Sequence, residues 1–158
     1  MAAVDYFLKI DGIDGESKAQ NAEKWIQLQS WSWGETNAGS MAVGGGGGSG
    51  KVAMQDFHFV MPVSTATPKL ILACATGQHI NKAVLHCRKA GGNQGEYLTY
   101  TFEDIMIASY QTSGSDSPTD QCSLNFTKIK VEYREQSAKG TLGGPITANY
   151  NLKTQRSE

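Results

Sequence analysis

The chain has 158 residues, a formal net charge of −1 and only 18% charged residues. Its length predicts one domain that buries enough apolar surface to fold without disulfide bonds. Near-neutral charge without a basic stripe argues against a nucleic-acid-binding protein. No apolar run approaches the ~20 residues of a membrane-spanning helix, so we expect no membrane span. We also find no charged-then-apolar leader of the secretory kind, and we therefore expect the protein to start in the cytosol.

Alternating apolar and polar residues predict two strands near the start of the chain. The first covers residues 4–10, and a polar, glycine-punctuated turn follows at residues 11–17. The second covers residues 24–33. Neither face of this second strand is purely apolar, so we expect it to lie between two environments.

The second strand predicts two contrasting faces. Trp25, Trp31 and Trp33 fall on one face, whereas Ser30 and Ser32 form a small polar patch on the other. Tryptophan is common in cores and at protein interfaces because it combines a large apolar ring with one polar group. The same three tryptophans could instead form a platform that binds a carbohydrate or protein ligand.

A long loop at residues 37–51 follows these strands. It contains five consecutive glycines, and each loses more backbone entropy on ordering than another residue would. A compact domain rarely carries such a loop unless the loop has a function. We therefore expect an arm that reaches a partner.

One strand and one helix are predicted after the loop. Residues 52–61 alternate as a strand, which Pro62 ends because proline cannot donate to a ladder. Residues 65–77 predict a helix, with Thr67 as its N-cap, Pro68 as its first helical residue and Gly77 as its C-terminal stop. A helix this short must pack on a sheet to be stable.

The second half of the chain predicts four more strands, at residues 80–89, 96–109, 121–135 and 145–153. A hairpin connection is expected at residues 91–95. The apolar residues switch from one face of the strand to the other near Asp104, which predicts a bulge or bend, and again at Thr127–Lys128, which predicts a bulge. About seven strands and one helix predict an antiparallel, mainly β domain that is closed, or nearly closed, as a barrel or sandwich.

The glycine-rich loop raises the question of nucleotide binding. Its end matches the pattern G-x-x-x-x-G-K, with Lys51 as the lysine. A phosphate-binding loop also needs Ser or Thr next and a helix after it, but Val52 and a strand pattern follow here. We therefore expect no nucleotide site.

The remaining candidates for chemistry do not combine into a site. They are three cysteines, three histidines and four strand carboxylates: Cys74, Cys87, Cys122, His58, His79, His86, Asp5, Asp56, Glu103 and Asp104. The spacings match no metal pattern, and two carboxylates cannot be paired from the sequence as a glycosidase requires. Asn125-Phe126-Thr127 matches a glycosylation acceptor, but it lies in a predicted strand. We expect no enzymatic activity, metal or cofactor, and mostly buried, reduced thiols, with a disulfide as the alternative.

Several segments together resemble one known family. They are Asp5-Tyr6-Phe7-Leu8-Lys9-Ile10, Gly15-Glu16-Ser17, Trp31-Ser32-Trp33-Gly34, the loop from Gly39-Ser40-Met41 to Gly50-Lys51-Val52, Gln55-Asp56, Thr67-Pro68 and Arg88-Lys89-Ala90-Gly91-Gly92. The sequence resembles the Hcp family, which forms the tail tube of the bacterial type VI secretion system. The resemblance extends from Asp5 to about Leu152.

The resemblance implies a single Hcp-like domain over residues 1–158. Its expected fold is a closed antiparallel β-barrel of two sheets, similar to phage tail-tube subunits, with one flanking α-helix and the extended loop. Six subunits would form a ring, and stacked rings would form a tube with a VgrG-type spike and a contractile sheath. The tube would lie in the cytoplasm before firing, would be secreted on contraction, and would carry small effectors in its lumen.

The resemblance also implies roles for particular residues. Ser32, with its neighbour Ser30, corresponds to a lumen-facing position implicated in effector binding. The loop residues expected to contact an adjacent subunit or ring are Gly39, Ser40, Met41, Val43, Gly44, Gly45, Gly46, Gly47, Gly48, Gly50 and Lys51. The alternative is a monomeric or dimeric binding module that uses the face of Trp25, Trp31 and Trp33.

Overall fold

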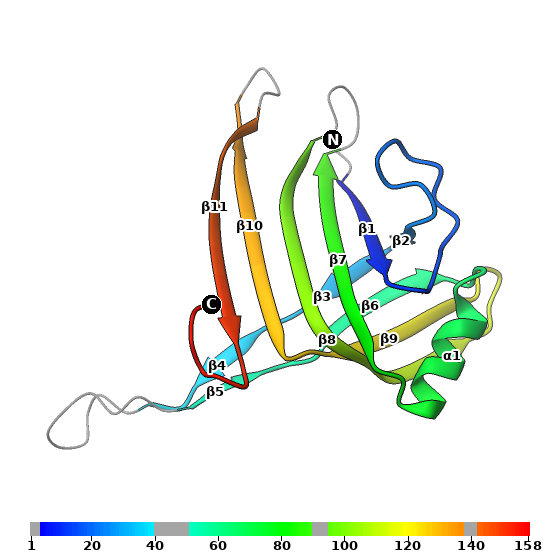
Figure 1. The fold of residues 1–158 in the computed structure, drawn as a ribbon. Helices are drawn as coiled ribbons and strands as arrows, with labels where there is room; N and C mark the ends of the chain where they lie inside the picture. Colours follow the sequence, from blue (N-terminus) through cyan, green and yellow to red (C-terminus); the bar gives the residue numbers. More distant parts are fainter. Residues whose placement is uncertain (1–3, 40–50, 90–94, 138–141) are drawn as a thin grey trace, which may run out of the picture.

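The computed structural model describes residues 4–39, 51–89, 95–137 and 142–158. These residues form a mainly β fold with one helix at its flank (Figure 1). The elements are β1 (Val4–Ile10), β2 (Ile26–Leu28), β3 (Ser30–Ser32), β4 (Glu35–Asn37), β5 (Val52–Met54), β6 (Phe57–Pro62), α1 (Thr67–Thr76), β7 (Ile80–Lys89), β8 (Glu96–Ser113), β9 (Thr119–Asn125), β10 (Lys128–Gln136) and β11 (Leu142–Asn151).

Nine strands form one large antiparallel sheet that folds over at β8. The order is β2-β1-β7-β8-β9-β6-β3, and β10 and β11 continue from β8. Residues 96–105 of β8 pair with β7, whereas residues 106–113 pair with β9. Asp104 lies at the bend with a φ of 53°, which confirms the predicted irregularity there.

The fold-over creates two layers that cross in Figure 1. The first layer contains β2, β1, β7, the start of β8, β10 and β11. The second layer contains the end of β8, β9, β6 and β3. β4 and β5 pair with each other as a separate two-stranded ribbon.

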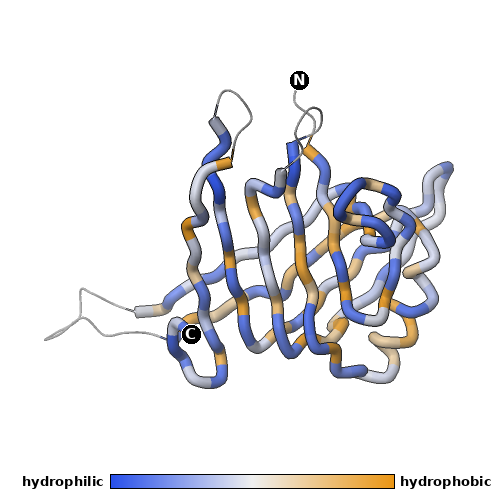
Figure 2. Tube along the Cα trace, turned by 45° about the horizontal axis from the view of Figure 1, so that its top comes forward, coloured by the Kyte–Doolittle hydropathy of each residue, from blue (hydrophilic) through white to orange (hydrophobic). Residues whose placement is uncertain are grey.

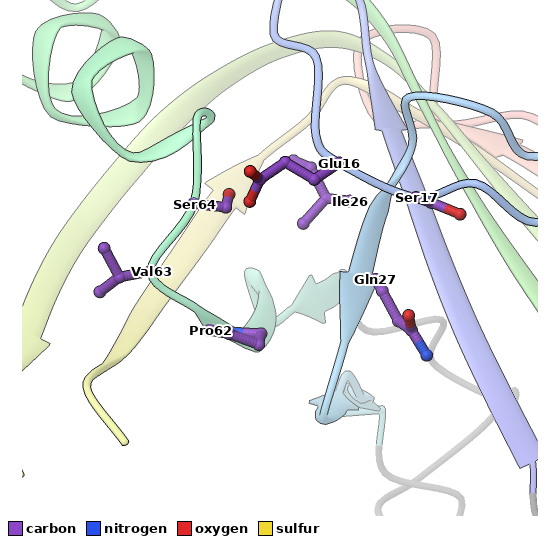
Figure 3. Close-up of a pocket in the computed structure, with 7 residues that line it drawn as sticks. All are labelled: Glu16, Ser17, Ile26, Gln27, Pro62, Val63 and Ser64. Atoms are coloured by element: carbon purple, nitrogen blue, oxygen red, sulfur yellow. The ribbon is translucent and has the colours of Figure 1, made fainter. Parts of the chain in front are cut away.

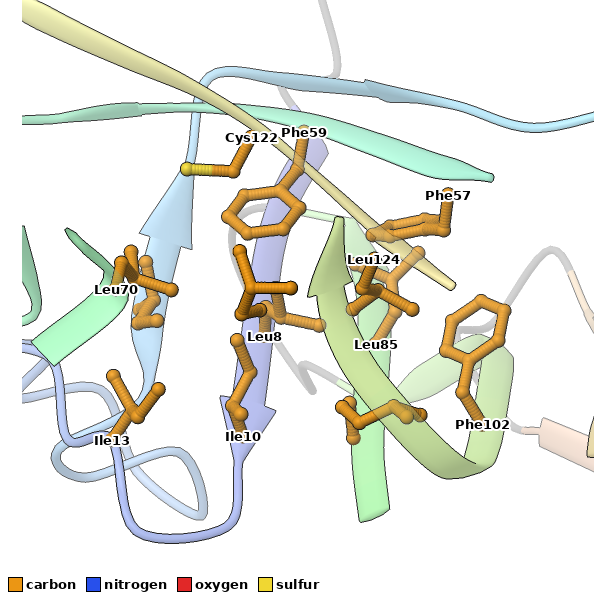
Figure 4. Close-up of a cluster of buried hydrophobic side chains, with 14 of the residues drawn as sticks. Leu8, Ile10, Ile13, Phe57, Phe59, Leu70, Leu85, Phe102, Cys122 and Leu124 are labelled. Carbon is orange, nitrogen blue, oxygen red and sulfur yellow. The ribbon is translucent and has the colours of Figure 1, made fainter. Parts of the chain in front are cut away.

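The core lies between the two layers. Leu8, Leu85 and Phe102 from the first layer face Phe57 and Leu124 from the second, and each is essentially inaccessible to solvent (Figure 4). Figure 2 shows the hydrophobic positions recurring between hydrophilic ones along the strands. Burying side chains of this size stabilises the fold by roughly 1.5–3 kcal/mol each.

The strand predicted over residues 24–33 is wrong as one element. It is two short strands, and β2 pairs with β1 in the first layer while β3 pairs with β6 in the second. The chain changes layers at Gln29, whose N–H donates to the Val60 carbonyl at 2.8 Å. The even-numbered residues face the core before the crossing and the odd-numbered residues face it afterwards. Buried Ile26 and Leu28 therefore do not share a face with exposed Ser30.

Two other predicted strands are also divided. Residues 52–61 become β5 and β6, and residues 121–135 become β9 and β10. At the second break the Thr127 N–H donates to the Glu103 carbonyl at 3.1 Å, and the chain returns from the second layer to the first. The prediction of about seven strands was therefore too low, although the antiparallel, mainly β class is confirmed.

The predicted helix is confirmed with a one-residue change at its start. Its N-cap is Ala66 rather than Thr67, so Pro68 is the second helical residue. Gly77 ends the helix in a left-handed conformation with a φ of 64°, as its missing side chain allows. At ten residues α1 is too short to span a bilayer, and no helix within the described ranges is long and apolar enough to do so.

The first and last strands in this order are adjacent along the chain. β2 and β3 lie at the two ends of the strand order, yet only Gln29 separates them in the sequence. Among the described residues, no strand ladder joins β2 directly to β3.

Candidate functional site

β3 has one buried and one open face. Trp31 points inward. The centre of its ring lies 5.9 Å from that of Phe57, on which it stacks, and 5.3 Å from that of Tyr100, which it meets edge-on. Ser30 and Ser32 are exposed on the opposite face. The prediction that Ser32 and Trp31 lie on opposite faces of the strand is therefore confirmed.

Ser32 begins a row of small polar groups across the second layer. In the register of the paired strands, Ser32 is the neighbour of His58, His58 is the neighbour of Ser123, and Ser123 is the neighbour of Ser109. The hydroxyls of Ser109 and Ser123 are 2.6 Å apart and share a hydrogen bond. His58 and Ser109 are exposed, whereas Ser123 is buried between its neighbours.

A parallel row runs beside the first. Ser30 lies opposite Val60, Val60 opposite Gln121, and Gln121 opposite Gln111. We call the two rows together the polar face: Ser30, Ser32, His58, Val60, Ser109, Gln111, Gln121 and Ser123. Apart from the apolar Val60, its side chains carry hydroxyl, amide and imidazole groups, and none carries a carboxylate, ammonium or guanidinium group.

Only Ser30 and Ser32 of the polar face were predicted. The signal for the others was present in β9, where polar Gln121 and Ser123 alternate with buried Cys122 and Leu124. The sequence could not show that these residues lie beside Ser32, because about ninety positions separate β3 from β9 along the chain.

The ribbon of β4 and β5 leaves the two layers and leads to the predicted loop (Figure 1). At the base of the ribbon the Gln55 N–H donates to the Gly34 carbonyl at 2.9 Å, and every residue of β4 is exposed.

Of the predicted contact residues, Gly39 and Lys51 are described and exposed. The others lie outside the described residues: Ser40, Met41, Val43, Gly44, Gly45, Gly46, Gly47, Gly48 and Gly50. Strand β5 follows Lys51, so the helix that a phosphate-binding loop requires is replaced by a strand.

An apolar stripe extends beyond the core on the first layer. Leu98, Tyr133 and Ile146 are neighbours in register across β8, β10 and β11. Ile146 is 72% exposed and Tyr133 is 45% exposed. Their row continues the inward-facing face of these strands past the edge of the second layer, and the sequence prediction did not include it.

The predicted tryptophan platform is contradicted by the structure. Trp25 lies on the outer face of the first layer, where its ring packs on His86 at 4.4 Å. Trp31 and Trp33 instead pack toward the core, and both contact Tyr100. The change of layers at Gln29 separates Trp25 from the other two, so the three rings share no face.

The candidate acids and bases do not form a catalytic group. Asp104 pairs with His79 at 3.0 Å on an exposed surface, and Asp56 accepts from Asn125 at 3.2 Å. Glu103 lies 3.8 Å from Lys128. Within the described ranges, no group of three His, Cys, Asp or Glu side chains could hold a metal ion.

All three cysteines are free thiols, and two of them are buried. Burial raises the pKa of both the Cys87 and Cys122 thiols to about 12. Cys74 on α1 is partly exposed. The prediction of mostly buried thiols is confirmed, and a disulfide is absent among these three residues.

A pocket of about 170 Å³ lies between β2 and the end of β6 (Figure 3). Its lining residues are Glu16, Ser17, Ile26, Gln27, Pro62, Val63 and Ser64. Figure 3 shows the Glu16 carboxylate directed toward Ser64, whose hydroxyl accepts from the Ala66 N–H at 3.2 Å. Glu16 is the one ionisable side chain in this lining, so the pocket provides no acid–base pair.

Known proteins similar to this chain agree on one family. The profile described as "Type VI secretion system effector, Hcp" matches residues 7–133. Protein hcp1 of Pseudomonas aeruginosa is 43% identical over 156 residues, which cover 96% of each chain. This chain belongs to the Hcp family.

Solved structures of type VI secretion proteins share the fold of this Hcp chain over almost its whole length. Hcp1 from Salmonella typhimurium is 38% identical, with complete coverage of both chains and a TM-score of 0.83. A structure described as a type six secretion system protein is 29% identical, with 99% of this chain and 100% of that chain covered and a TM-score of 0.93. The chain is therefore an Hcp protein of the type VI secretion inner tube, in a structural and non-enzymatic family.

Proposed function

We propose that six copies of this Hcp protein close into a ring whose polar face lines a central channel. The observation that carries this proposal is the second layer, which has an aromatic core on one side and an uncharged polar surface on the other. Hydroxyl and amide groups form weak, reversible hydrogen bonds with cargo. They hold passing proteins less firmly than a charged or apolar wall would.

Ring closure requires two different surfaces of each copy to meet. The apolar stripe of Leu98, Tyr133 and Ile146 supports this arrangement, because exposed apolar rows are typical of protein contacts. The β4–β5 ribbon supports a second contact, in which residues 37–51 reach an adjacent subunit or ring. Stacked rings would then form the tube.

The barrel of each subunit closes, in this proposal, where β2 passes into β3. One strand segment pairs with β1 and the next with β6, so a single stretch of chain joins both ends of the sheet. The Gln29–Val60 backbone hydrogen bond supports this closure. A closed barrel removes the exposed sheet edges that promote aggregation.

The proposed tube works with partners that are expected from the family. These are a VgrG-type spike, a contractile sheath and small secreted effectors carried in the channel. The protein would occupy the cytoplasm before firing and would be secreted when the sheath contracts.

Effector loading is tested at Ser32. We expect Ser32→Gln to leave the ring intact but weaken loading, because a larger side chain projects from the polar face into the channel. Co-purification of a cognate effector measures loading, and light scattering measures the ring. Ser115→Gln, in an exposed loop, is the matched control and should load normally. Unchanged loading in Ser32→Gln would remove Ser32 from the effector site.

The extended loop is tested by deleting residues 44–48. We expect the subunit to fold, because these residues fall between β4 and β5 in the sequence and the described strands of both layers are left intact. Stacking of rings into tubes should be impaired, and electron microscopy measures it. A deletion variant that forms tubes as long as those of the wild type would contradict this role.

A further inference from the structure

A second buried cluster lies outside the main core, on the outer face of the first layer. Residues 14–25 cover it, and Phe7 and Arg88 beneath them are 3% and 1% exposed. The Arg88 guanidinium lies 4.9 Å from the centre of the Phe7 ring. The Trp25 ring packs on the His86 imidazole at 4.4 Å. The tube role does not use this cluster.

Two side-chain contacts hold the covering segment against β7, in addition to the close backbone packing of Gly15 on Ile26 of β2. Arg88 Nη1 donates to the Gln20 carbonyl at 2.7 Å, and Trp25 packs on His86. The segment is also held together internally, because the Gly15 N–H donates to the Lys24 carbonyl at 2.7 Å. We therefore expect the segment to loosen from β7 as a unit when these two contacts are weakened.

One carboxylate oxygen serves two basic groups in this cluster. Glu96 Oε1 lies 3.2 Å from Arg88 Nη2 and 3.4 Å from His86 Nδ1. With neutral His86, the charges of Arg88 and Glu96 cancel. A proton on His86 adds a positive charge beside an arginine that has almost no access to water, and unpaired buried charge is costly.

Other charged groups also face His86. Glu132 on β10 acts on it electrostatically and favours the protonated form, and the Glu132 carboxylate lies 3.6 Å from the Arg134 guanidinium. Asp5 on β1 lies opposite Arg88 in the strand register. The buried Nδ1 of His86 forms no hydrogen bond within the described residues, and the carboxylate nearest to it, Glu96, is already shared with Arg88.

We propose that His86 is the trigger of an acid-sensitive clamp, in which protonation of its imidazole releases residues 14–25 from the outer face of the first layer. This device is separate from the channel and goes beyond the tube function. It would let the acidity of the surroundings alter the outer surface of the subunit without opening the main core.

The direction of the pH effect follows from burial. Burial lowers the pKa of His86 below its ordinary value of 6.5, with Glu96 opposing this effect and Arg88 adding to it. His86 therefore binds a proton less tightly when residues 14–25 cover it than when they are released. Anchoring is complete above pH 6.5 and weakens as the pH falls toward the lowered pKa, by about tenfold in the release equilibrium for each pH unit between the two values.

Hydrogen exchange of the full chain tests the clamp. Exchange at residues 14–25 is compared between pH 7.5 and pH 5, after correction for the intrinsic pH dependence of exchange. We expect these amides to lose protection at pH 5 while the amides of β7 keep theirs. His86→Gln should remove the pH dependence. His79→Gln is the matched control, because His79 also contacts a carboxylate but is exposed, and it should behave as the wild type does.

Two results would overturn the clamp. One is constant protection of residues 14–25 across this pH range in the wild type, and the other is the same pH-dependent loss in His86→Gln. If His86→Gln does not fold, nuclear magnetic resonance of the wild type decides the question. The clamp is supported if the pH titration of the His86 imidazole has a midpoint below 6.5 and the amide signals of Ser17 and Ala22 change with the same midpoint. It is contradicted if the midpoints differ or if the His86 midpoint is 6.5 or above.

Discussion

Asp120 ties the helix to the second layer from within the core. It is fully buried, its Oδ2 accepts from the Thr67 hydroxyl at 2.6 Å, and its Oδ1 accepts from the Tyr110 hydroxyl at 2.7 Å. Burial and the Asp120 hydrogen bond raise the pKa of Tyr110. The neutral phenol therefore remains the donor at ordinary pH.

Removing this carboxylate should destabilise the subunit. We expect Asp120→Ala to lower the free energy of unfolding by about 2–4 kcal/mol, because two partly buried hydroxyl donors lose their acceptor. Chemical denaturation measures the change. Asp116→Ala, in the exposed loop before β9, is the control and should change stability little. Equal stability of the two variants would show that the Asp120 hydrogen bonds contribute nothing.

The three thiols should differ in reactivity. Thiolates are the reactive species, and burial holds the pKa of Cys87 and Cys122 near 12, so both should resist alkylation at pH 8. Partly exposed Cys74 should react first. Mass spectrometry of peptides after iodoacetamide treatment measures the order. Labelling of Cys87 or Cys122 as fast as that of Cys74 in the folded protein would contradict the described burial.

At the scale of elements, the turn between β1 and β2 depends on a close backbone contact at Gly15. A Cβ atom there would lie 2.5 Å from the Trp25 carbonyl oxygen and 2.6 Å from the Ile26 Cα. We expect Gly15→Ala to cost about 1–3 kcal/mol of stability, because the opposing atoms are backbone and must move.

The control for this substitution is Gly114→Ala in the loop before β9. A Cβ atom at Gly114 would meet no atom within 4 Å. Thermal unfolding should show a lower midpoint for Gly15→Ala alone. If both variants unfold at the wild-type temperature, the packing of residues 14–25 on β2 is looser than described.

Alternation of residue types predicted the elements that stay in one layer. The strands at residues 4–10 and 80–89 have the predicted bounds, and Gly77 ends the helix as expected. The pattern failed at residues 24–33, because Gln29 carries the chain between layers without a proline or glycine to mark the crossing. The parity switch at Thr127–Lys128 was visible, but it marks a similar crossing rather than a bulge.

At the scale of the whole molecule, the predictable part of the site is its local alternation. Ser32 opposite Trp31 could be predicted from neighbouring residues in one strand. His58, Ser123 and Ser109 could not be placed beside Ser32, because their positions depend on the pairing of distant strands. The apolar stripe was missed for the same reason, since it becomes exposed only where β10 and β11 extend past the second layer.

The central claim, a ring of six subunits around the polar face, is tested most directly by the mass of the purified protein in solution. Size-exclusion chromatography with light scattering gives this mass, and negative-stain images of the same peak give the particle shape. We predict a mass near six subunits and annular particles with an open centre. A monomer mass that persists at high concentration, together with images that contain no rings, would contradict the account.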